Sequence, residues 1–254
     1  MGGETEFEGL SAIITGAGSG IGLATTAALA MRGTRVGALD LHPPDGSANV
    51  IPVDADVTDQ ESVNSAVARL MDAFGGIDLL INNAGIGAVG TVEDNSDEEW
   101  HKVYDTNVVG MVRMARATLP YLRRSKRAVI VNVSSIAATA GLPKRACYSA
   151  TKGAVLSLTL AMAADLLDDG IRVNCVCPGT VDTPWVGRLL SSADDPAVER
   201  AAMEARQPMG RLGTAEEIAI AIVFLAAPSS SFVTGGALAV DGGMSGLRVP
   251  ARPR

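Results

Sequence analysis

Short runs of apolar residues recur along the chain, and longer stretches with a helical spacing of apolar positions separate them. The apolar runs occupy residues 10–15, 35–39, 51–53, 77–81, 128–133, 171–176 and 237–240. The helical patterns occupy residues 21–31, 59–74, 97–123, 149–167 and 214–226. Strands of a parallel sheet are covered on both faces and therefore read as continuous apolar runs. The alternation predicts a single α/β domain, a doubly wound parallel sheet of about seven strands flanked by helices.

One long stretch, residues 179–213, carries no strand pattern and contains Pro184, Pro196 and Pro208. Insertions of this size near strand ends are often lids over a binding site. A surface loop without a function is the alternative interpretation.

Composition and charge narrow the classes of protein that fit this pattern. The chain is 47% hydrophobic and 19% charged, with 21 basic and 28 acidic residues and a net charge of −7. This balance lacks the basic character of a nucleic-acid binder. No apolar run reaches the about 20 residues of a membrane span, and the first nine residues carry Glu4, Glu6 and Glu8 instead of a basic leader. We therefore expect a cytoplasmic protein.

The few cysteines and histidines argue against a disulfide framework and a zinc site. Two histidines are too few for the usual zinc ligand sets, and Cys175 and Cys177 are close neighbours in an apolar run. We interpret these two cysteines as core thiols at a strand end.

A glycine-rich turn follows the first predicted strand and opens the first predicted helix. Its residues are Thr15, Gly16, Ala17, Gly18, Ser19, Gly20, Ile21 and Gly22. Such a turn lets the backbone approach a pyrophosphate, which the free N–H groups of the helix would bind, as in Rossmann-type folds. Asp40 ends the second strand, where an acid would bind the ribose diol of adenosine; an ordinary loop acid is the alternative. An Asp at this place repels a 2′-phosphate, so NAD is favoured over NADP.

The spacing of the glycines, with three residues between Gly16 and Gly20, resembles that of the classical short-chain dehydrogenase/reductase (SDR) family. Further motifs of the family occur in order between residues 10 and 243. The resemblance implies an adenine-contacting pair, a segment lining the cofactor cleft, and a segment holding the nicotinamide amide. Asp56 and Val57 match the adenine-contacting pair, and Asn83, Ala84 and Gly85, which follow Asn82, match the segment that lines the cleft. Pro178, Gly179, Val181 and Thr183 match the segment that holds the nicotinamide amide.

Tyr148 and Lys152 stand four residues apart in a helical pattern, so both lie on one helix face. A free tyrosine titrates near pH ~10, and a neighbouring lysine charge would favour its phenolate as a proton acceptor. The family resemblance gives this pair the catalytic role and gives Lys152 contacts with the nicotinamide ribose. It also implies that Ser135 holds the substrate oxygen, with Ser134 as its supporting neighbour; the exchange of these two roles is the alternative. Asn107 matches a fourth catalytic position, where the helix is interrupted and a proton relay is supported; a polar residue on the helix surface is the alternative.

Three arginines flank the expected substrate site: Arg145 before the tyrosine, and Arg188 and Arg206 in the stretch 179–213. Guanidinium groups bind carboxylates in bidentate fashion, so together they favour a carboxylate-bearing substrate. Each one alone could be an ordinary solvated residue. Few aromatic residues occur in these segments; Trp185 is the exception, and we expect it to line the substrate site together with the arginines, Ser135 and Tyr148.

The segments 144–148 and 174–184 resemble the cytosolic type 2 3-hydroxybutyrate dehydrogenase and sugar-acid dehydrogenase subgroup. In the hydroxybutyrate enzymes, arginines matching Arg145 and Arg206 bind the substrate carboxylate, whereas Arg188 is displaced by one position. The resemblance implies an NAD-dependent dehydrogenase of a small hydroxy acid or sugar acid. A 3-oxoacyl-carrier-protein reductase, a neutral sugar or polyol dehydrogenase, and a non-catalytic nucleotide-sensing protein are the alternatives.

The family resemblance also implies a homotetramer, assembled through the helices at 97–123 and 149–167 and through the C-terminal strand.

The motifs and patterns described above divide the single domain, residues 1–254, into four parts. They are a nucleotide-binding part at 10–133, a catalytic helix and substrate lid at 134–213, a C-terminal helix and strand at 214–246, and a mobile tail at 247–254.

Overall fold

The computed structural model describes residues 6–191 and 193–248. In this part of the chain, seven parallel strands form one sheet in the order β3-β2-β1-β4-β5-β6-β7. The strands are β1 (Ser11–Thr15), β2 (Arg35–Asp40), β3 (Val50–Asp54), β4 (Leu79–Asn82), β5 (Val129–Val133), β6 (Arg172–Pro178) and β7 (Ala237–Val240). The predicted doubly wound sheet is confirmed.

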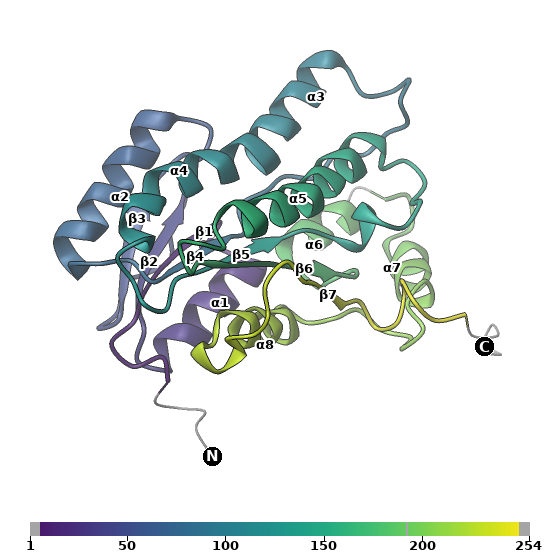
Figure 1. The fold of residues 1–254 in the computed structure, drawn as a ribbon. Coiled ribbons are helices and arrows are strands. Elements are labelled where there is room, and N and C mark those ends of the chain that lie inside the picture. The colour runs from purple at the N-terminus through teal and green to yellow at the C-terminus, as the bar shows by residue number, and fades with distance from the viewer. Residues whose placement is uncertain (1–5, 192, 249–254) are drawn as a thin grey trace.

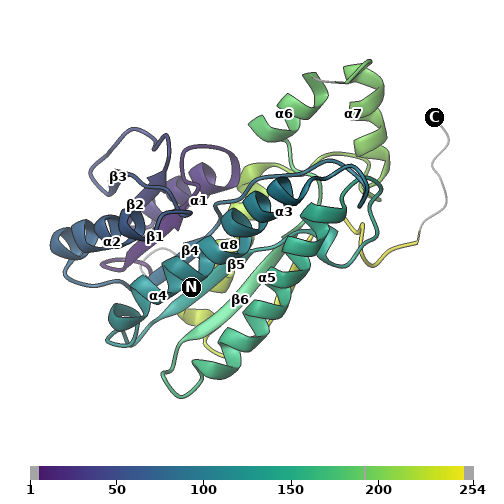
Figure 2. The same ribbon diagram turned by 90° about the horizontal axis from the view of Figure 1, so that it is seen from above.

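Helices cover both faces of the sheet (Figure 1). One layer contains α2 (Gln60–Phe74), α3 (Asp97–Tyr104), α4 (Gly110–Leu122) and α5 (Ala146–Asp165). The other contains α1 (Gly20–Ala30) and α8 (Ala215–Ala226), which pack against each other. Two further helices, α6 (Pro184–Ser191) and α7 (Pro196–Ala205), project from one end of this assembly (Figure 2).

Successive residues of a strand pack into two separate hydrophobic cores, one on each face of the sheet. Ile14 packs with Leu29 of α1 and Ile222 of α8, whereas its neighbour Ile13 packs with Leu70 of α2 and other residues of that layer. Side chains alternate between the two faces of a strand, and both faces are covered here. This is the physical reason why the strands appeared as unbroken apolar runs.

The helical pattern at 97–123 is not one continuous helix. The segment Asp105–Val109 between α3 and α4 is a π-helical turn, and Asn107 lies buried within it. The interruption that the family resemblance implied is therefore present.

The stretch 179–213 contains α6 and α7, which its prolines concealed in the sequence. Pro184 begins α6 and Pro196 stands at the start of α7, where the missing N–H of proline costs no helical hydrogen bond. Asp195 caps α7 by accepting from the amides of Ala197 and Val198.

None of the helices in the described ranges is long and apolar enough to cross a membrane. Of the tail that we expected to be mobile, residues 249–254 lie outside the described residues.

Candidate active site

A cavity of about 430 Å³ opens at the carboxyl ends of the central strands. β1 pairs with β2 on one side and β4 on the other, so the chain leaves the middle of the sheet in opposite directions. Ligands of open α/β sheets bind in the crevice at this point. The cavity walls come from the glycine turn, the ends of β2, β4, β5 and β6, the start of α5, and α6 with α7.

The glycine turn is fastened to the end of β4 by Asn83. The Asn83 Nδ2 donates to the carbonyl oxygens of Thr15 and Gly16 at 3.0 Å each. The Thr15 hydroxyl accepts from the amides of Asn83 and Ala84. A Cβ on Gly22 would lie 2.0 Å from the Gly16 oxygen, so only glycine fits there.

The walls of the cavity include most of the residues that the sequence assigned to the cofactor. They are Gly16, Ser19, Gly20, Ile21, Asp40, Asn83, Ala84, Gly85, Pro178, Gly179, Val181 and Thr183, with Tyr148 and Lys152. Gly22, Asp56 and Val57 lie outside these walls, and the Asp56 carboxylate accepts from the amide and hydroxyl of Thr58. The Asp40 carboxylate accepts from the amides of Gly18 and His42 at 2.9 Å.

The glycine turn and the start of α1 fit a dinucleotide. Ser19, the N-cap of α1, makes no side-chain cap bond, and the first turn of the helix carries no acidic side chain. The amides at a helix N-terminus point outward with a positive dipole, which suits a pyrophosphate. A nicotinamide cofactor held here would supply the hydride acceptor or donor.

Tyr148 stands in the first turn of α5, beside the end of β5. Its hydroxyl is hydrogen-bonded to Ser135, whereas the Ser134 hydroxyl donates to the backbone oxygen of Lys152 at 2.9 Å. Burial raises the pKa of Tyr148, and the Ser135 hydrogen bond and the Arg145 charge oppose this rise. Ser135, and not Ser134, is thus the hydroxyl next to the phenol.

Lys152 lies one helical turn further along α5 and is 4% exposed. Its Nζ donates to the Val133 oxygen at 2.9 Å and lies 5.7 Å from the centroid of the Tyr148 ring. Burial lowers the pKa of Lys152 to about 8, and the neighbouring Cys177 thiol partly opposes this shift. The ammonium group is therefore still charged at neutral pH, but at a cost in stability.

Cys175 and Cys177 are free and buried, as we expected for core thiols, and Cys147 is free and buried as well. The pKa of Cys177 is lowered because Cys175, Ser134 and Lys152 surround its sulfur with hydrogen bonds and charge.

Asn107 does not line the cavity, but it holds Ile86, which does. Its Nδ2 donates to the Ile86 oxygen at 2.9 Å and to the Thr151 hydroxyl at 3.0 Å, and its Oδ1 accepts from the Ile86 amide at 2.7 Å. These bonds join the loop after β4 to α5 next to Lys152.

All three arginines line the cavity, but they are held differently. Arg145 is half-buried, donates to the Ala88 oxygen at 3.1 Å and lies over the ring of Trp185. Burial lowers the pKa of Arg145. Arg188 is exposed on α6, and Arg206 is paired with Glu199 at 3.2 Å. Of the three arginines, Arg145 is thus the one that lies closest to Tyr148 along the chain, and its hydrogen bond to the Ala88 backbone oxygen fixes its position.

An uncommon backbone conformation precedes Arg145. Lys144 has a φ of +54°, which L residues other than Asn and Asp rarely adopt. Gly90 holds it from both sides, because its amide donates to the Lys144 oxygen and its oxygen accepts from the Ala146 amide. This strained conformation lies directly before Arg145, whose side chain binds the Ala88 oxygen at the cavity wall.

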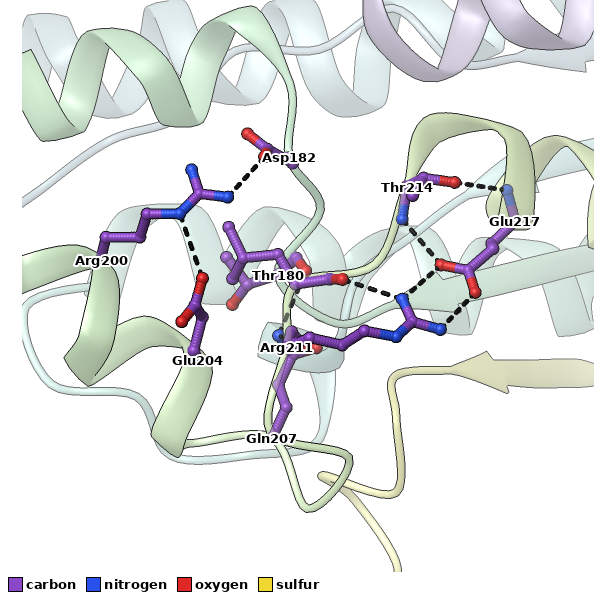
Figure 3. A network of polar contacts seen from close by, with 9 residues as sticks. Thr180, Asp182, Arg200, Glu204, Gln207, Arg211, Thr214 and Glu217 are labelled. Atoms are coloured by element: carbon purple, nitrogen blue, oxygen red, sulfur yellow. Dashed lines mark hydrogen bonds and ion pairs between the residues drawn. The ribbon is translucent and has the colours of Figure 1, made fainter. Parts of the chain in front are cut away.

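The arm formed by α6 and α7 is fastened to the end of β6 (Figure 3). Arg200 of α7 donates to Asp182 at 2.7 Å and to Glu204 at 3.1 Å. Beyond α7, Arg211 pairs with Glu217 of α8 at 2.8 Å, and Glu217 also accepts from the Thr214 amide.

Gln207 is a buried anchor that the sequence pattern did not reveal. Its Nε2 donates to the oxygens of Thr180 and Arg211 at 3.3 and 2.8 Å (Figure 3), and its Oε1 abuts Gly179. No periodic pattern marks this single glutamine; only its place beside Arg206 could have drawn attention to it.

The buried Lys152 ammonium predicts a pH-dependent stability. In the unfolded chain its pKa is near 10.5, whereas in the fold it is about 8, so the unfolded state binds more protons between these values. The free energy of unfolding therefore rises with pH in this window, and the full cost of the buried charge is present below pH 8. We expect Lys152→Met to raise the free energy of unfolding at pH 7 by up to about 3 kcal/mol, and Tm with it.

This gain should shrink as the pH approaches 10, in Tm measured by calorimetry across the pH range. Lys102→Met, at an exposed lysine of α3, is the control and should change Tm little at any pH. A gain for Lys152→Met that stays constant from pH 7 to 10 would contradict the assignment.

The Lys144 conformation predicts a stabilising substitution. Lys144→Gly removes the steric cost of the positive φ and should stabilise the fold by about 1 kcal/mol. Lys144→Ala keeps that cost and serves as the matched control. Denaturant unfolding of both variants checks the difference, and equal stabilities would show that no strain is stored at this position.

The sequence matches known proteins over nearly its whole length. A model of the family described as "Enoyl-(Acyl carrier protein) reductase" matches residues 16–245. The 2-(R)-hydroxypropyl-CoM dehydrogenase of Xanthobacter autotrophicus is 40% identical over 250 residues, which cover 93% of this chain and 98% of that protein. The 2-keto-3-deoxy-L-fuconate dehydrogenase of Xanthomonas campestris is 38% identical over 250 residues, covering 95% and 82%.

The fold is matched as closely by a solved structure. The ligand-free aldohexose dehydrogenase (AldT) of Thermoplasma acidophilum superposes with a TM-score of 0.92 at 33% identity, covering 99% of this chain and 100% of that one. Fold, motif order and relatives agree: the chain belongs to the classical short-chain dehydrogenase/reductase family and is an oxidoreductase that acts with a nicotinamide cofactor.

Proposed function

We propose that the protein is an NAD-dependent dehydrogenase that interconverts a small secondary hydroxy acid, or a sugar acid, and its ketone. One observation carries this proposal: the half-buried Arg145 lies one helical turn before Tyr148, on the same cavity wall as Ser135 and Lys152. An anion-binding group and a proton-transfer group therefore flank one small space. The 2-keto-3-deoxy-L-fuconate dehydrogenase, whose name includes a sugar acid, supports this substrate class.

Proton transfer falls to residues of α5 and the end of β5. Ser135 would hold the substrate oxygen, and Tyr148 would take the alcohol proton or return it to a ketone. The Lys152 ammonium stabilises a phenolate on Tyr148, and Lys152 would also bind the nicotinamide ribose. At neutral pH both groups carry protons, which is the state that donates to a ketone. Asn107 would support a proton relay to Lys152 by holding Ile86 and Thr151 in place.

The choice of NAD rests on Asp40. Its carboxylate lines the cavity at the end of β2, tied to the Gly18 and His42 amides, and would repel a 2′-phosphate. The pyrophosphate would lie on the start of α1, at Gly16, Ser19, Gly20 and Ile21, and the nicotinamide amide against 178–183. Asp56 and Val57 would contact the adenine only at the rim, because they lie outside the cavity walls.

A neutral sugar is the second candidate substrate, because the AldT structure matches this fold closely and is named for an aldohexose. A 3-oxoacyl-carrier-protein reductase is less well supported, since Asp40 disfavours NADPH and the net charge of −7 disfavours an acidic carrier.

We further expect a homotetramer in the cytoplasm. Tyr104, Val109 and Leu160 are exposed apolar residues at α3, the π-turn and α5, and Ala161 and Ala164 are exposed beside them. Near the edge strand β7, Phe232 is fully exposed. Such apolar surface supports burial in an assembly.

A substrate panel tests the function. NADH formation is measured with hydroxy acids, sugar acids, neutral sugars and neutral alcohols, with NADP in parallel. We expect turnover of acids with NAD, and Tyr148→Phe should abolish it while retaining NAD binding, because the ring remains and the proton carrier is lost. Turnover confined to neutral substrates would overturn the acid, and turnover only with NADP would overturn the cofactor choice.

The three arginines give a graded prediction for the acid substrate. Arg145→Met should raise KM for the acid by roughly 30-fold, equivalent to about 2 kcal/mol for a lost charged hydrogen bond. Arg188→Met removes an exposed guanidinium from the same cavity and is the matched control, with a change of no more than about threefold. Equal effects of the two substitutions on KM would remove Arg145 from the anion site.

A further inference from the structure

Trp185, the second residue of α6, spans the substrate end of the cavity. Its ring lies 6.2 Å from the Tyr148 ring, centroid to centroid, with an angle of 23° between their planes. The Arg145 guanidinium carbon lies 5.4 Å from the same indole. The indole thus covers both the proton-transfer group and the arginine nearest to it.

The far edge of the indole rests on Gly87, in the loop after β4. A Cβ at this position would lie 2.3 Å from Cζ2, 2.7 Å from Cε2 and 2.9 Å from Nε1 of Trp185. Real Cβ atoms do not approach other atoms this closely, so any side chain at 87 would displace the indole.

The backbone itself does not demand a glycine at position 87. Gly87 is absent from the glycines with a positive φ, whereas Gly90, three residues on, has a φ of +152°. What an added side chain at 87 would meet is the indole. Its neighbour Ala88 accepts the Arg145 hydrogen bond, so indole and guanidinium are seated on adjacent residues of one loop.

We propose that Trp185 and Gly87 together form a size filter over the alcohol site. Trp185 is the specificity-determining side chain, and Gly87 is a positioning residue that acts through it. The proposal builds on the proposed function, because it assumes that the carbinol carbon lies beside Tyr148. The indole then limits the size of the groups attached to that carbon, so short substrates fit and longer homologues are excluded.

A fluorescence experiment tests the seat of the indole without any substrate. Trp100 and Trp185 are the two tryptophans of the chain, so Trp100→Phe leaves Trp185 as the sole indole emitter. In this background Gly87→Ala should at least double the acrylamide quenching constant of Trp185. Gly76→Ala is the matched control, since a Cβ there meets nothing within 4 Å, and it should leave quenching unchanged. Unchanged quenching in Gly87→Ala would overturn the proposed contact.

Kinetics with a homologous series test the filter. The series takes the panel substrate with the highest kcat/KM and adds two and four methylene groups on the side of the carbinol carbon away from the acid. A neutral substrate, if the panel identifies one, is extended in the same way. Trp185→Ala should raise the ratio of kcat/KM for the long over the short homologue by about tenfold or more.

The double variant separates positioning from general damage. Gly87→Ala should raise KM for the short substrate by about fivefold with little change in kcat, and by less than twofold in the Trp185→Ala background. Equal effects in both backgrounds, or an unchanged length ratio in Trp185→Ala, would refute the filter. The quenching result stands apart from the panel, so a failure of the proposed function and a failure of the filter are distinguishable.

Discussion

The hydrogen bonds of Asn83 hold together the two central strands at the place where the site forms. β1 and β4 lie side by side in the sheet, although more than 60 residues separate them in the chain. The Asn83 amide binds the carbonyls that leave β1, and the Thr15 hydroxyl binds the amides that leave β4. A Cβ on Gly22 would lie 2.6 Å from the same amide, so the start of α1 also depends on it. The two strand ends on either side of the crevice are thereby held together by hydrogen bonds between one side chain of each strand end and the backbone of the other.

The residues that we propose for proton transfer are then placed by buried polar contacts. The Lys152 ammonium donates a hydrogen bond to the Val133 oxygen. Asn107, in the π-helical turn, uses its side-chain amide for hydrogen bonds with Ile86 and Thr151. Each contact satisfies a polar group that would be costly to bury alone. No acidic residue in the described part of the chain is paired with Lys152, and burial lowers its pKa, so the fold gives up stability to keep an ammonium beside Tyr148. A site of this kind is maintained by the rigidity of β5 and α5 around it.

Local sequence patterns predicted the strands and the catalytic helix, but they did not reveal features that depend on contacts between distant residues. Strands appeared because both of their faces are buried, and Tyr148 with Lys152 appeared because a spacing of four defines a helix face. The helices α6 and α7 were not predicted, because the sequence analysis found only a lid or loop containing prolines in this stretch; Pro184 and Pro196 stand at the helix starts. The roles of Gly87 and Gln207 could not be predicted from a local pattern. Gly87 contacts Trp185, about 100 residues away, and Gln207 binds Thr180, about 30 residues away.

The two walls of the cavity differ in how firmly they are held. Ser135, Tyr148 and Lys152 lie on elements packed against the large cores of the sheet. Trp185, Arg188 and Arg206 lie on or beside helices whose own core is the small cluster of Val186, Leu190, Met203 and Leu212. The ion pairs that fasten this arm, such as Arg200 with Asp182, are 42% and 48% exposed, and pairs of this kind contribute about 1 kcal/mol or less. The arm is thus held less firmly than Ser135, Tyr148 and Lys152, although its Trp185 stacks on the Tyr148 ring. Relatives with the same fold and named for different alcohols are what such a division of the molecule would produce.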